Sequence, residues 1–353
     1  MLYISDTSTD PFFNLAEEEY LLTQKTDSVF RLWRNAPSII VGRYQNTIAE
    51  INTEYTQEHN IPVVRRLSGG GAVFHDLGNL NFSFIQNRAC SEGGNALRKQ
   101  AADTSEMFRR FTAPIIDALR SLGVNAELQG RNDISIDGKK ISGNAICIHR
   151  DRILMHGTLM FDVSTTDLSR ALRPRPEKFI GKAVKSNVKR VTNIKEHLTP
   201  EGILQNPIAS ASLKNSTPNI LWFTRFLSDY ICSHIEGVTP YSLTTEDIRC
   251  IEELKKSRYS TPEWNFGNSP KYSFSNIRRF PSGIVELYMN VENGTIKNLD
   301  IRGDYFFSRP TEELIAKLIG TPHTREAIQK KIGSQTEAYF AGIDSEDVVN
   351  LFF

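Results

Sequence analysis

The sequence predicts a two-domain protein that mixes α-helices with β-strands. At 353 residues the chain is long for one domain, so two domains are expected. Strand-like apolar runs alternate with amphipathic helical patterns along most of the chain. Residues 236–241 look like a linker between domains, and the roughly one hundred residues that follow predict a compact α+β unit.

Composition narrows the class of protein. Hydrophobic residues make up 39% and charged residues 24%, which is ordinary for a globular protein in water. The formal net charge of +1 gives no overall field that would recruit nucleic acid or a membrane. The four cysteines are scattered without a CxxC pair, and no run reaches the roughly 20 apolar residues of a membrane span. The N-terminus has no signal-peptide pattern, so we expect a cytoplasmic protein with reduced thiols.

Each element is predicted from its apolar period and its end signals. After an opening strand, Asn14 is expected to cap a helix that runs to about Thr26. A long amphipathic helix is expected over residues 101–122, covering a sheet. Residues 205–219 are polar and predict a loop. The remaining strands are expected at 28–33, 38–43, 132–136, 139–148, 153–161, 271–280, 283–290 and 295–301, and the remaining helices at 52–59, 218–235, 244–258, 311–319, 324–332 and 345–352.

A glycine-rich stretch between two strand-like runs is the strongest local signal. Arg65 and Arg66 precede Ser68 and three consecutive glycines, residues 69–71. Exposed backbone N–H groups beside two guanidinium groups form a natural cradle for an anion. The alternative is a glycine-rich hairpin with two surface arginines. The stretch is neither a Walker A loop nor a GxGxxG fingerprint, so by itself it indicates a phosphate site without identifying the ligand.

A predicted hairpin carries the second signal. Asp137-Gly138 is a favoured two-residue turn, and period two places Lys140, Ser142 and Asn144 on one face of the returning strand. These side chains could form the polar wall of a site. They could equally belong to an exposed edge strand, where lysine discourages aggregation.

Two further features allow more than one interpretation. His156 has no second histidine at ligand spacing, so a hydrogen-bonded, partly buried imidazole is expected in place of a metal ligand. Residues 170–190 contain eight basic residues and one acidic residue. Such a run fits a solvated or RNA-binding loop, although few aromatic residues interleave it, and it fits equally a mobile loop that closes over an anionic ligand.

Taken together, these motifs resemble the lipoate–protein ligase family. The resemblance rests on ordered motifs that cover nearly the whole chain: Phe13-Asn14-Leu15-Ala16-x-Glu18-Glu19, Arg65-Arg66-x-Ser68-Gly69-Gly70-Gly71-Ala72-Val73-Phe74-His75-Asp76-x-Gly78-Asn79-x-Asn81-Phe82, Asn132-Asp133, Lys140-x-Ser142-Gly143, His156-Gly157-Thr158-Leu159, Val191-Thr192-Asn193 and Trp264-Asn265-Phe266-Gly267. The chain departs from relatives at Cys147, where an arginine is frequent.

The resemblance implies a fold and an activity. The fold would be α/β, with a mixed, largely antiparallel sheet flanked by helices, followed by a small α+β domain. Residues 1–240 would form the catalytic domain and residues 241–353 the accessory domain. The enzyme would use lipoate, ATP and Mg²⁺, with no permanently bound cofactor, to form lipoyl-AMP and pyrophosphate. It would then transfer the lipoyl group to a lysine of a lipoyl domain, in 2-oxoacid dehydrogenase acyltransferases or in the glycine-cleavage H protein.

The resemblance also assigns residues. Lys140 would be the catalytic cation that neutralises charge in both transition states. Asp133 would contact Mg²⁺. The expected ATP or adenylate contacts are Arg66, Gly69, Gly70, Gly71, Phe74, Asn79, Asp133, Lys140 and Lys182, and the expected lipoate contacts are Leu15, Glu18, Arg66, Ser68, Gly71, His75, Gly143 and His156.

Two alternatives stay open at the level of sequence. The first is a transferase of the same fold that uses a pre-activated acyl donor; a substrate variant is an octanoate or biotin ligase. The second is a non-catalytic lipoate-binding protein. The presence of Lys140, Arg66 and residues 69–71 favours an enzyme, and an accessory domain favours the complete ligase. We further hypothesise that the small domain swings about residues 237–241 between the two steps.

Overall fold

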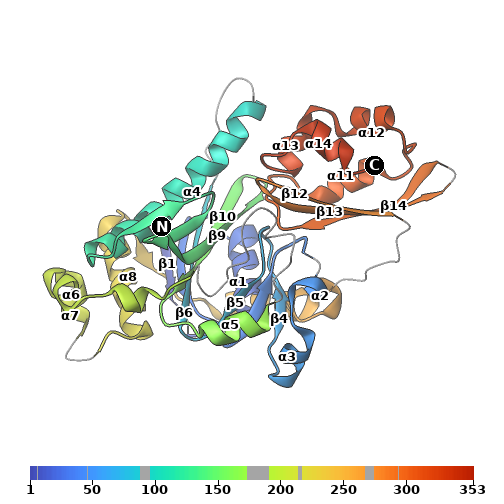
Figure 1. The fold of residues 1–353 in the computed structure, drawn as a ribbon. Coiled ribbons are helices and arrows are strands. Elements are labelled where there is room, and N and C mark those ends of the chain that lie inside the picture. Colours follow the sequence, from blue (N-terminus) through green and yellow to red (C-terminus); the bar gives the residue numbers. More distant parts are fainter. Residues whose placement is uncertain are drawn as a thin grey trace.

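A computed structural model describes most of the chain, which is shown in Figure 1. The described residues are 1–5, 7–45, 47–87, 96–172, 191–213, 217–266, 274–292 and 294–353. A large sheet with helices on both faces fills one part of the molecule, and a smaller unit with its own sheet contains the C-terminus (Figure 1). The predicted combination of a mixed sheet and a small α+β unit is confirmed.

Eight strands form the large sheet. Their spatial order is β11 (Thr239–Pro240), β1 (Leu2–Ser5), β2 (Val29–Trp33), β6 (Asn79–Asn87), β10 (Arg152–Met160), β9 (Lys139–His149), β8 (Asp133–Ile136) and β7 (Ala126–Gln129). The pairs β11–β1 and β1–β2 are parallel, and the other five pairs are antiparallel. The sheet is therefore mixed and largely antiparallel, as the family resemblance implied.

The two faces of this sheet pack against different helices. On one face, α4 (Ala96–Ser121) and α8 (Ile220–His234) bury Phe108 and Phe223 against Phe82 of β6. On the other face, α1 (Pro11–Gln24) packs Leu15 and its neighbours against Val29 and the residues beside it. Burial of these aromatic and aliphatic side chains supplies the main driving force for the layered structure.

Helix α1 begins earlier than expected. The carboxylate of Asp10 accepts hydrogen bonds from the backbone N–H groups of Phe12 and Phe13, and Pro11 occupies the first helical turn. Asn14, predicted as the cap, lies inside the helix and is fully buried. Its amide is needed elsewhere, because it bonds Arg31, Arg34 and Asn35 in the interior.

The glycine-rich stretch does not form a hairpin. β4 (Val63–Arg65) and β5 (Val73–His75) both pair with β3 (Ser38–Val41), which lies between them in a second, three-stranded sheet. β3 is parallel to β4 and antiparallel to β5. The loop of residues 66–72 must therefore cross the end of β3, which brings its backbone close to the residues that follow that strand.

The remaining helices of this part of the chain are short, apart from α9. Residues 207–213, expected as a loop, form α7 because the side chain of Asn206 accepts from the backbone N–H groups of Ile208 and Ala209. These helices are α2 (Thr47–Glu50), α3 (Thr53–Glu58), α5 (Thr165–Ala171), α6 (Pro200–Gln205), α7 (Pro207–Leu213), α9 (Thr245–Leu254) and α10 (Pro262–Asn265), with a 3₁₀ turn η3 (Ile194–His197) and a π-helical turn η4 (Lys255–Tyr259).

The segment expected as a linker is held by the large sheet. Strand β11 pairs with β1, and the helix α9 that follows packs on α1. Asp247 of α9 accepts hydrogen bonds from Tyr20 (2.5 Å) and Tyr241 (2.6 Å) and lies 2.8 Å from the ammonium of Lys25. The residues after 240 are thus joined to the unit of the large sheet over at least one helix.

The small unit combines a three-stranded antiparallel sheet with helices. Its elements are β12 (Phe274–Phe280), β13 (Gly283–Glu292), β14 (Thr295–Gly303), α11 (Thr311–Leu318), α12 (Arg325–Ile332), a 3₁₀ turn η5 (Gly333–Gln335), α13 (Thr336–Tyr339) and α14 (Ser345–Asn350). The helices pack on one side of the sheet through their own apolar core (Figure 1). In the described part of the chain, no helix is both long enough and apolar enough to cross a bilayer.

Candidate active site

A cavity lies between the α1 face of the large sheet and the three-stranded sheet of β4, β3 and β5. Strand register explains its floor: Trp33, Asn81 and Thr158 are directly paired across β2, β6 and β10, and all three line the cavity. Two residues along these strands, Ser83 and His156 form the next cross-strand pair on the same face. The full lining is Leu15, Trp33, Ile40, Arg66, Gly70, Gly71, Ala72, Val73, His75, Asn81, Asn132, Lys140, Gly143, Asn144, Ala145, His156, Gly157 and Thr158.

Eight of the residues proposed from sequence meet in this cavity. They come from four separate stretches of the chain, which the fold brings together: Leu15, Arg66, Gly70, Gly71, His75, Lys140, Gly143 and His156. Glu18 and Ser68 lie directly behind this wall and contact His156. Lys182 lies outside the described residues.

Lys140 reaches the cavity because of a β-bulge. Ile134 pairs with Ser142 and Ser135 pairs with Lys140, which leaves Ile141 as the extra residue of β9. The bulge breaks the predicted alternation. Lys140 lies over Gly143, where an added Cβ would be 3.0 Å from its Nζ, whereas the Ser142 hydroxyl donates to Asn144 and does not line the cavity. The prediction that Lys140, Ser142 and Asn144 share one face is therefore wrong.

Lys140 and Asp133 form the solvent-accessible end of the site. Lys140 Nζ lies 2.8 Å from Asp133 Oδ1, and the two side chains are 38% and 37% exposed. An ion pair this exposed contributes little to stability. A ligand can therefore replace one partner at low cost, which suits a site that must release its product.

Arg66 holds the glycine-rich loop in shape. Its Nη2 donates to the carbonyls of Gly69 (2.7 Å) and Gly71 (2.9 Å), its Nη1 to Ile40 O, and its Nε to the hydroxyl of Ser68. Burial lowers the pKa of this guanidinium to about 10, so it stays cationic at neutral pH. Most of its donors are used by the protein itself. Arg66 therefore contributes mainly fixed positive charge and a preorganised loop.

The loop fits tightly between two other backbone segments. A Cβ on Gly42, just after β3, would lie 2.0 Å from the carbonyl oxygen of Gly70, and a Cβ on Gly69 would lie 2.3 Å from that of Tyr305. Gly70 itself has φ +91°, which L side chains rarely adopt. Glycine is required here because the backbone segments approach each other closely. The segment at Tyr305 belongs to the small C-terminal unit.

Arg65 is a structural residue and not a ligand of the cavity. Its buried guanidinium donates to the carbonyls of Gly42, Gln45 and Trp264, among others. Asn265 Oδ1 accepts from Arg65 N at 2.9 Å. These contacts join the residues after β3 to α10, and so fix the frame on which the glycine-rich loop rests.

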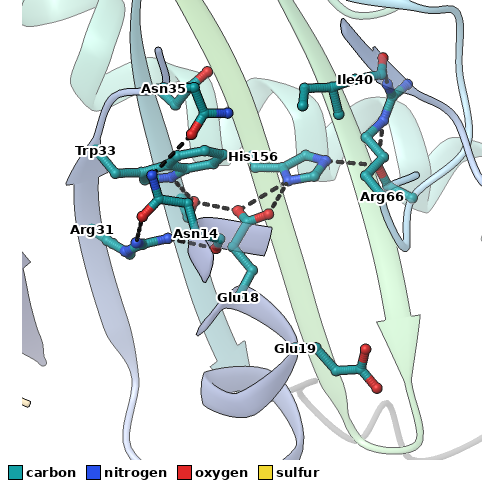
Figure 2. Close-up of polar contacts among 12 residues, drawn as sticks. Asn14, Glu18, Glu19, Arg31, Trp33, Asn35, Ile40, Arg66 and His156 are labelled. Carbon is teal, nitrogen blue, oxygen red and sulfur yellow. Dashed lines mark hydrogen bonds and ion pairs between the residues drawn. The ribbon is translucent and has the colours of Figure 1, made fainter. Parts of the chain in front are cut away.

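His156 is at the centre of a satisfied hydrogen-bond chain, shown in Figure 2. Its Nδ1 lies 2.9 Å from Glu18 Oε2 and its Nε2 2.6 Å from Ser68 Oγ. Ser83 donates to Glu18, and the indole N–H of Trp33 donates to Ser83. Although burial opposes ionisation, contacts with His156 and Ser83 lower the pKa of Glu18, so the carboxylate is charged. Both nitrogens of His156 are occupied by protein atoms, as the sequence predicted.

His75 differs from His156 in one respect. Its Nδ1 lies 3.1 Å from Asn35 Nδ2, but its buried Nε2 has no hydrogen-bond partner among the described residues. Burial, reinforced by the nearby Arg66 and His156, lowers the pKa of His75 to about 3, so the imidazole is neutral. The buried Nδ2 of Asn81 also lacks a partner within the described chain. Both side chains line the cavity, so its inner end presents unused polar groups to a ligand.

Three predicted ATP contacts do not present their side chains to the cavity. Phe74 packs its ring in a core with Ile39 and Ile61, because alternate residues of β5 point to opposite faces. Asn79 donates to Asn81 Oδ1 at 2.9 Å and lies behind it. Gly69 is covered by Tyr305. The side chains of Phe74 and Asn79 therefore lie outside the lining of this cavity, and their contacts with ATP stay a prediction.

Sequence reasoning missed Trp33, Ile40, Asn81 and Thr158. A signal for Asn81 was present: the run 79–84 alternates polar and aromatic or aliphatic residues, so one face of a buried strand is polar. Trp33 and Ile40 look like ordinary core residues along the chain. Only strand register places them beside the polar positions.

The small unit covers the outer side of the glycine-rich loop. The ring of Phe306 packs with Phe108 of α4 (centroids 5.7 Å apart), and Arg131 lies over it at 3.9 Å. Tyr44 stacks on Tyr305 and donates to Glu312 at 2.8 Å. Phe306 belongs to the core of the large-sheet unit and Tyr305 to the core of the small unit. The C-terminal unit is therefore a neighbour of the site.

Family models match both parts of the chain. Residues 10–211 match the lipoyl protein ligase A/B catalytic domain, and residues 269–352 match the bacterial lipoate protein ligase C-terminus. The chain belongs to the lipoate–protein ligase family. The matched ranges contain every described residue that lines the cavity and the unit that covers its loop.

Relatives named as lipoate–protein ligases match this chain over its full length. The lipoate-protein ligase LplJ of Bacillus subtilis is 39% identical, with 100% of both chains covered. Lipoate–protein ligase 1 of Staphylococcus aureus is 41% identical, with 99% of each chain covered.

Solved structures of the family share the fold. LipL1 of P. falciparum in complex with lipoate superposes with a TM-score of 0.68 at 24% identity, covering 99% of this chain and 97% of the other. A bi-partite ligase from Thermoplasma acidophilum, described with its E2 lipoyl domain, has a TM-score of 0.59 at 27% identity, covering 77% and 98%. A lipoate-protein ligase A bound with ATP has a TM-score of 0.54 at 26% identity, covering 75% and 97%.

Proposed function

We propose that this protein is an ATP-dependent lipoate–protein ligase, which makes lipoyl-AMP and transfers the lipoyl group to a protein lysine. One observation carries the proposal: a single cavity joins a cationic end, at Lys140 and Arg66, to an enclosed end whose lining side chains, Trp33, His75 and Asn81, are uncharged. A carboxylic acid with a long apolar chain needs both environments at once.

The cationic end suits adenylate formation. In that step a carboxylate oxygen bonds to the α-phosphorus of ATP, and the bond to pyrophosphate breaks. Negative charge accumulates where Lys140 and the Gly70–Gly71 backbone lie, and fixed cations there stabilise the transition state. Arg66 adds positive charge and keeps the loop in place through the carbonyls of Gly69 and Gly71.

Asp133 is the residue suited to hold Mg²⁺. A magnesium ion at a nucleotide is commonly bound by one or two carboxylates together with the phosphates, and Asp133 supplies an accessible carboxylate 2.8 Å from Lys140. In the described part of the chain, no cluster of three or more His, Cys, Asp or Glu residues forms a metal site on its own. The ion would neutralise phosphate charge when it arrives with ATP.

The same end suits transfer to a protein. The acceptor amine attacks the acyl carbonyl, AMP leaves, and an amide forms. Lys140 is half-exposed, whereas Trp33 and His75 are each 3% exposed, so an acceptor lysine has to enter beside Lys140. The lipoyl domain described with the Thermoplasma ligase supports a lipoyl domain as acceptor, such as those of 2-oxoacid dehydrogenase acyltransferases or the H protein.

The proposal also assigns a role to each of the two parts of the chain. We assign residues 1–240 to catalysis and residues 241–353 to the accessory role. The packing of α9 on α1 means that motion would have to occur beyond this helix, not at residues 237–241. An ATP-dependent reaction and scattered thiols also support a cytoplasmic location.

Mass spectrometry tests the proposal directly. Purified protein is mixed with lipoate, ATP and Mg²⁺ without an acceptor, and the same is done with Lys140→Ala. We expect lipoyl-AMP with the wild type and its loss with Lys140→Ala. A lipoyl domain is then added, and its mass should rise by one lipoyl group.

Two other results would assign a different function. If only synthetic lipoyl-AMP gave a lipoylated acceptor, the protein would be a transferase that depends on another activating enzyme. If lipoate bound but neither step occurred, the protein would be a lipoate-binding protein without catalysis.

A further inference from the structure

A buried hydrogen-bond chain leads from the interior to His75. Arg31 Nη2 donates to Asn14 Oδ1 at 2.8 Å, Asn14 Nδ2 lies 2.9 Å from Asn35 Oδ1, and Asn35 Nδ2 lies 3.1 Å from His75 Nδ1. Figure 2 shows Arg31, Asn14 and Asn35 along this chain. All four side chains are at most 3% exposed. None of them is used by the reaction steps described above.

The direction of each hydrogen bond in this chain is determined by its neighbours. A guanidinium can only donate, so the oxygen of the Asn14 amide must face Arg31. The nitrogen of that amide faces the backbone carbonyls of Ser8 and Arg34, which can only accept. The two hydrogens of this nitrogen are shared among three acceptors, because Asn35 lies 2.9 Å from it as well. An NH2 group of Asn35 would meet the Asn14 NH2 group donor to donor, so Asn35 presents Oδ1 to Asn14 and its nitrogen faces His75.

His75 must therefore accept at Nδ1. In a neutral imidazole one nitrogen accepts and the other carries the proton, so Nε2 is the donor. This N–H is buried, lines the cavity and meets no acceptor in the described chain. The Nδ2 of Asn81 is a second donor without a partner, because Asn79 occupies the oxygen of that amide. Buried donors of this kind normally have a partner, so two in one cavity indicate a ligand acceptor.

The position of the donors identifies the part of the ligand that they meet. From Lys140 on β9 the sheet order runs through β10 to Asn81 on β6 and then to Trp33 on β2. With a spacing of about 4.8 Å between strands, the donors on and beside β6 and β2 lie roughly 10–14 Å from the Lys140 strand. A carboxylate at Lys140 therefore places the far end of its acyl chain at His75 and Asn81.

We propose that the Arg31–Asn14–Asn35 chain fixes His75 as an Nε2–H donor, which with Asn81 forms a subsite that reads the far end of the acyl group. The subsite favours an acyl chain with an acceptor atom there, such as the sulfur of a dithiolane ring, over a plain hydrocarbon chain. A hydrocarbon leaves both donors buried without partners, which disfavours its binding. The selectivity part of this inference rests on the proposed function; the tautomer of His75 does not.

Nitrogen NMR of the full chain tests the tautomer without any activity. In protein labelled with ¹⁵N-histidine, the signals of His75 are identified by their loss in His75→Phe. We expect protonated Nε2 and bare Nδ1 in the wild type. Asn35→Asp presents a carboxylate to Nδ1 and keeps the oxygen that accepts from Asn14, so Nδ1 becomes protonated. A wild-type signal with Nδ1 protonated and Nε2 bare overturns the inference.

Substrate competition tests the selectivity. We compare kcat/KM for lipoate, octanoate and 6-oxo-octanoate, which carries an oxygen acceptor on C6, one of the two carbons that bear sulfur in lipoate. The wild type is expected to prefer lipoate over octanoate by about tenfold or more, with the keto acid also better than octanoate. His75→Phe and Asn81→Leu should each lower the lipoate-to-octanoate ratio at least about threefold. Because each ratio is measured on one protein, partial unfolding cancels.

Ile40→Val is the matched control, since it changes the volume of the cavity without removing a donor. Its ratio should change less than about twofold, whatever happens to turnover. An unchanged ratio in both donor variants, or an equal drop in Ile40→Val, overturns the selectivity. Failure to adenylate any of the three acids would contradict the proposed function instead, and the NMR result would still decide the tautomer.

Discussion

The two ends of the cavity are built on opposite principles. At the outer end, the Lys140–Asp133 pair is more than one-third exposed, and a glycine-rich loop is held by Arg66 under a second structural unit. At the inner end, His75 and Trp33 are almost fully buried, and uncharged hydrogen-bond groups are oriented by the interior. The outer end is suited to changing charge during catalysis, and the inner end is suited to recognising an unchanging chain.

The two histidines that line the cavity, His75 and His156, also differ from each other. His156 has protein partners at both nitrogens, so it holds Glu18 and Ser68 in place. Among the described residues, His75 has a hydrogen-bond partner at Nδ1 and none at Nε2. A residue that completes its hydrogen bonds internally supports the wall of a site, whereas one that leaves a buried donor unused is available to the ligand.

The largest expected effect is at the outer end. Lys140→Ala should reduce the rate of adenylate formation by about 10²–10³, because it removes a fixed cation from a transition state that gains negative charge. Lys139→Ala is the matched control, since Lys139 is the exposed neighbour and does not line the cavity. Pre-steady-state measurement of AMP-ester formation gives both rates. Equal losses in the two variants would mean that general surface charge, and not this side chain, drives the step.

The inner end should make stability depend on pH. His75 has a folded pKa of about 3, below its ordinary value of 6.5, so between these values the unfolded chain binds a proton that the folded protein does not. Stability is therefore complete above about pH 6.5 and decreases as the pH falls, by up to about 1.4 kcal/mol per pH unit. Urea unfolding of the wild type and of His75→Asn from pH 7 to pH 4.5 measures this slope. The variant should show a shallower decrease; identical slopes would contradict a neutral buried His75.

Gly42→Ala should separate the two ends kinetically. Its Cβ would meet the carbonyl of Gly70 at 2.0 Å, so the loop must move. We expect a loss of about 1–3 kcal/mol in unfolding free energy. The KM for ATP should rise more than the KM for lipoate. Ile39→Val on the same strand changes core volume without touching the loop, and it should leave the ratio of the two KM values unchanged. A larger rise in the KM for lipoate than in the KM for ATP would contradict the position of the loop at the phosphate-binding end.

The smallest expected effect concerns the unit that covers the outer end. Tyr44→Phe removes a hydrogen bond to Glu312 but keeps the stacking on Tyr305, so a loss of about 1 kcal/mol is expected. Tyr55→Phe removes a similar bond to Asp167 within the catalytic part. Calorimetry should show that only Tyr44→Phe changes the coupling between the two units. If both variants behaved alike, Tyr44 would have no special role in holding the C-terminal unit.

The sequence by itself determined the motifs and most of the elements. The glycine-rich loop, the hairpin of β8 and β9 and the helices α4 and α8 follow from local signals such as turn residues and apolar period, which act over a few residues. The family motifs also proposed Lys140, Arg66 and both histidines as site residues, and all four line one cavity.

Tertiary structure decided the orientation of these groups. A one-residue bulge in β9, which depends on pairing with β8, places Lys140 in the cavity and removes Ser142 from it. Strand register alone places Trp33 and Asn81 side by side. Asn14 seemed to cap a helix, but its interior position orients Asn35 and thereby the proton of His75. These features arise from contacts between segments far apart in the chain, which local propensity cannot encode.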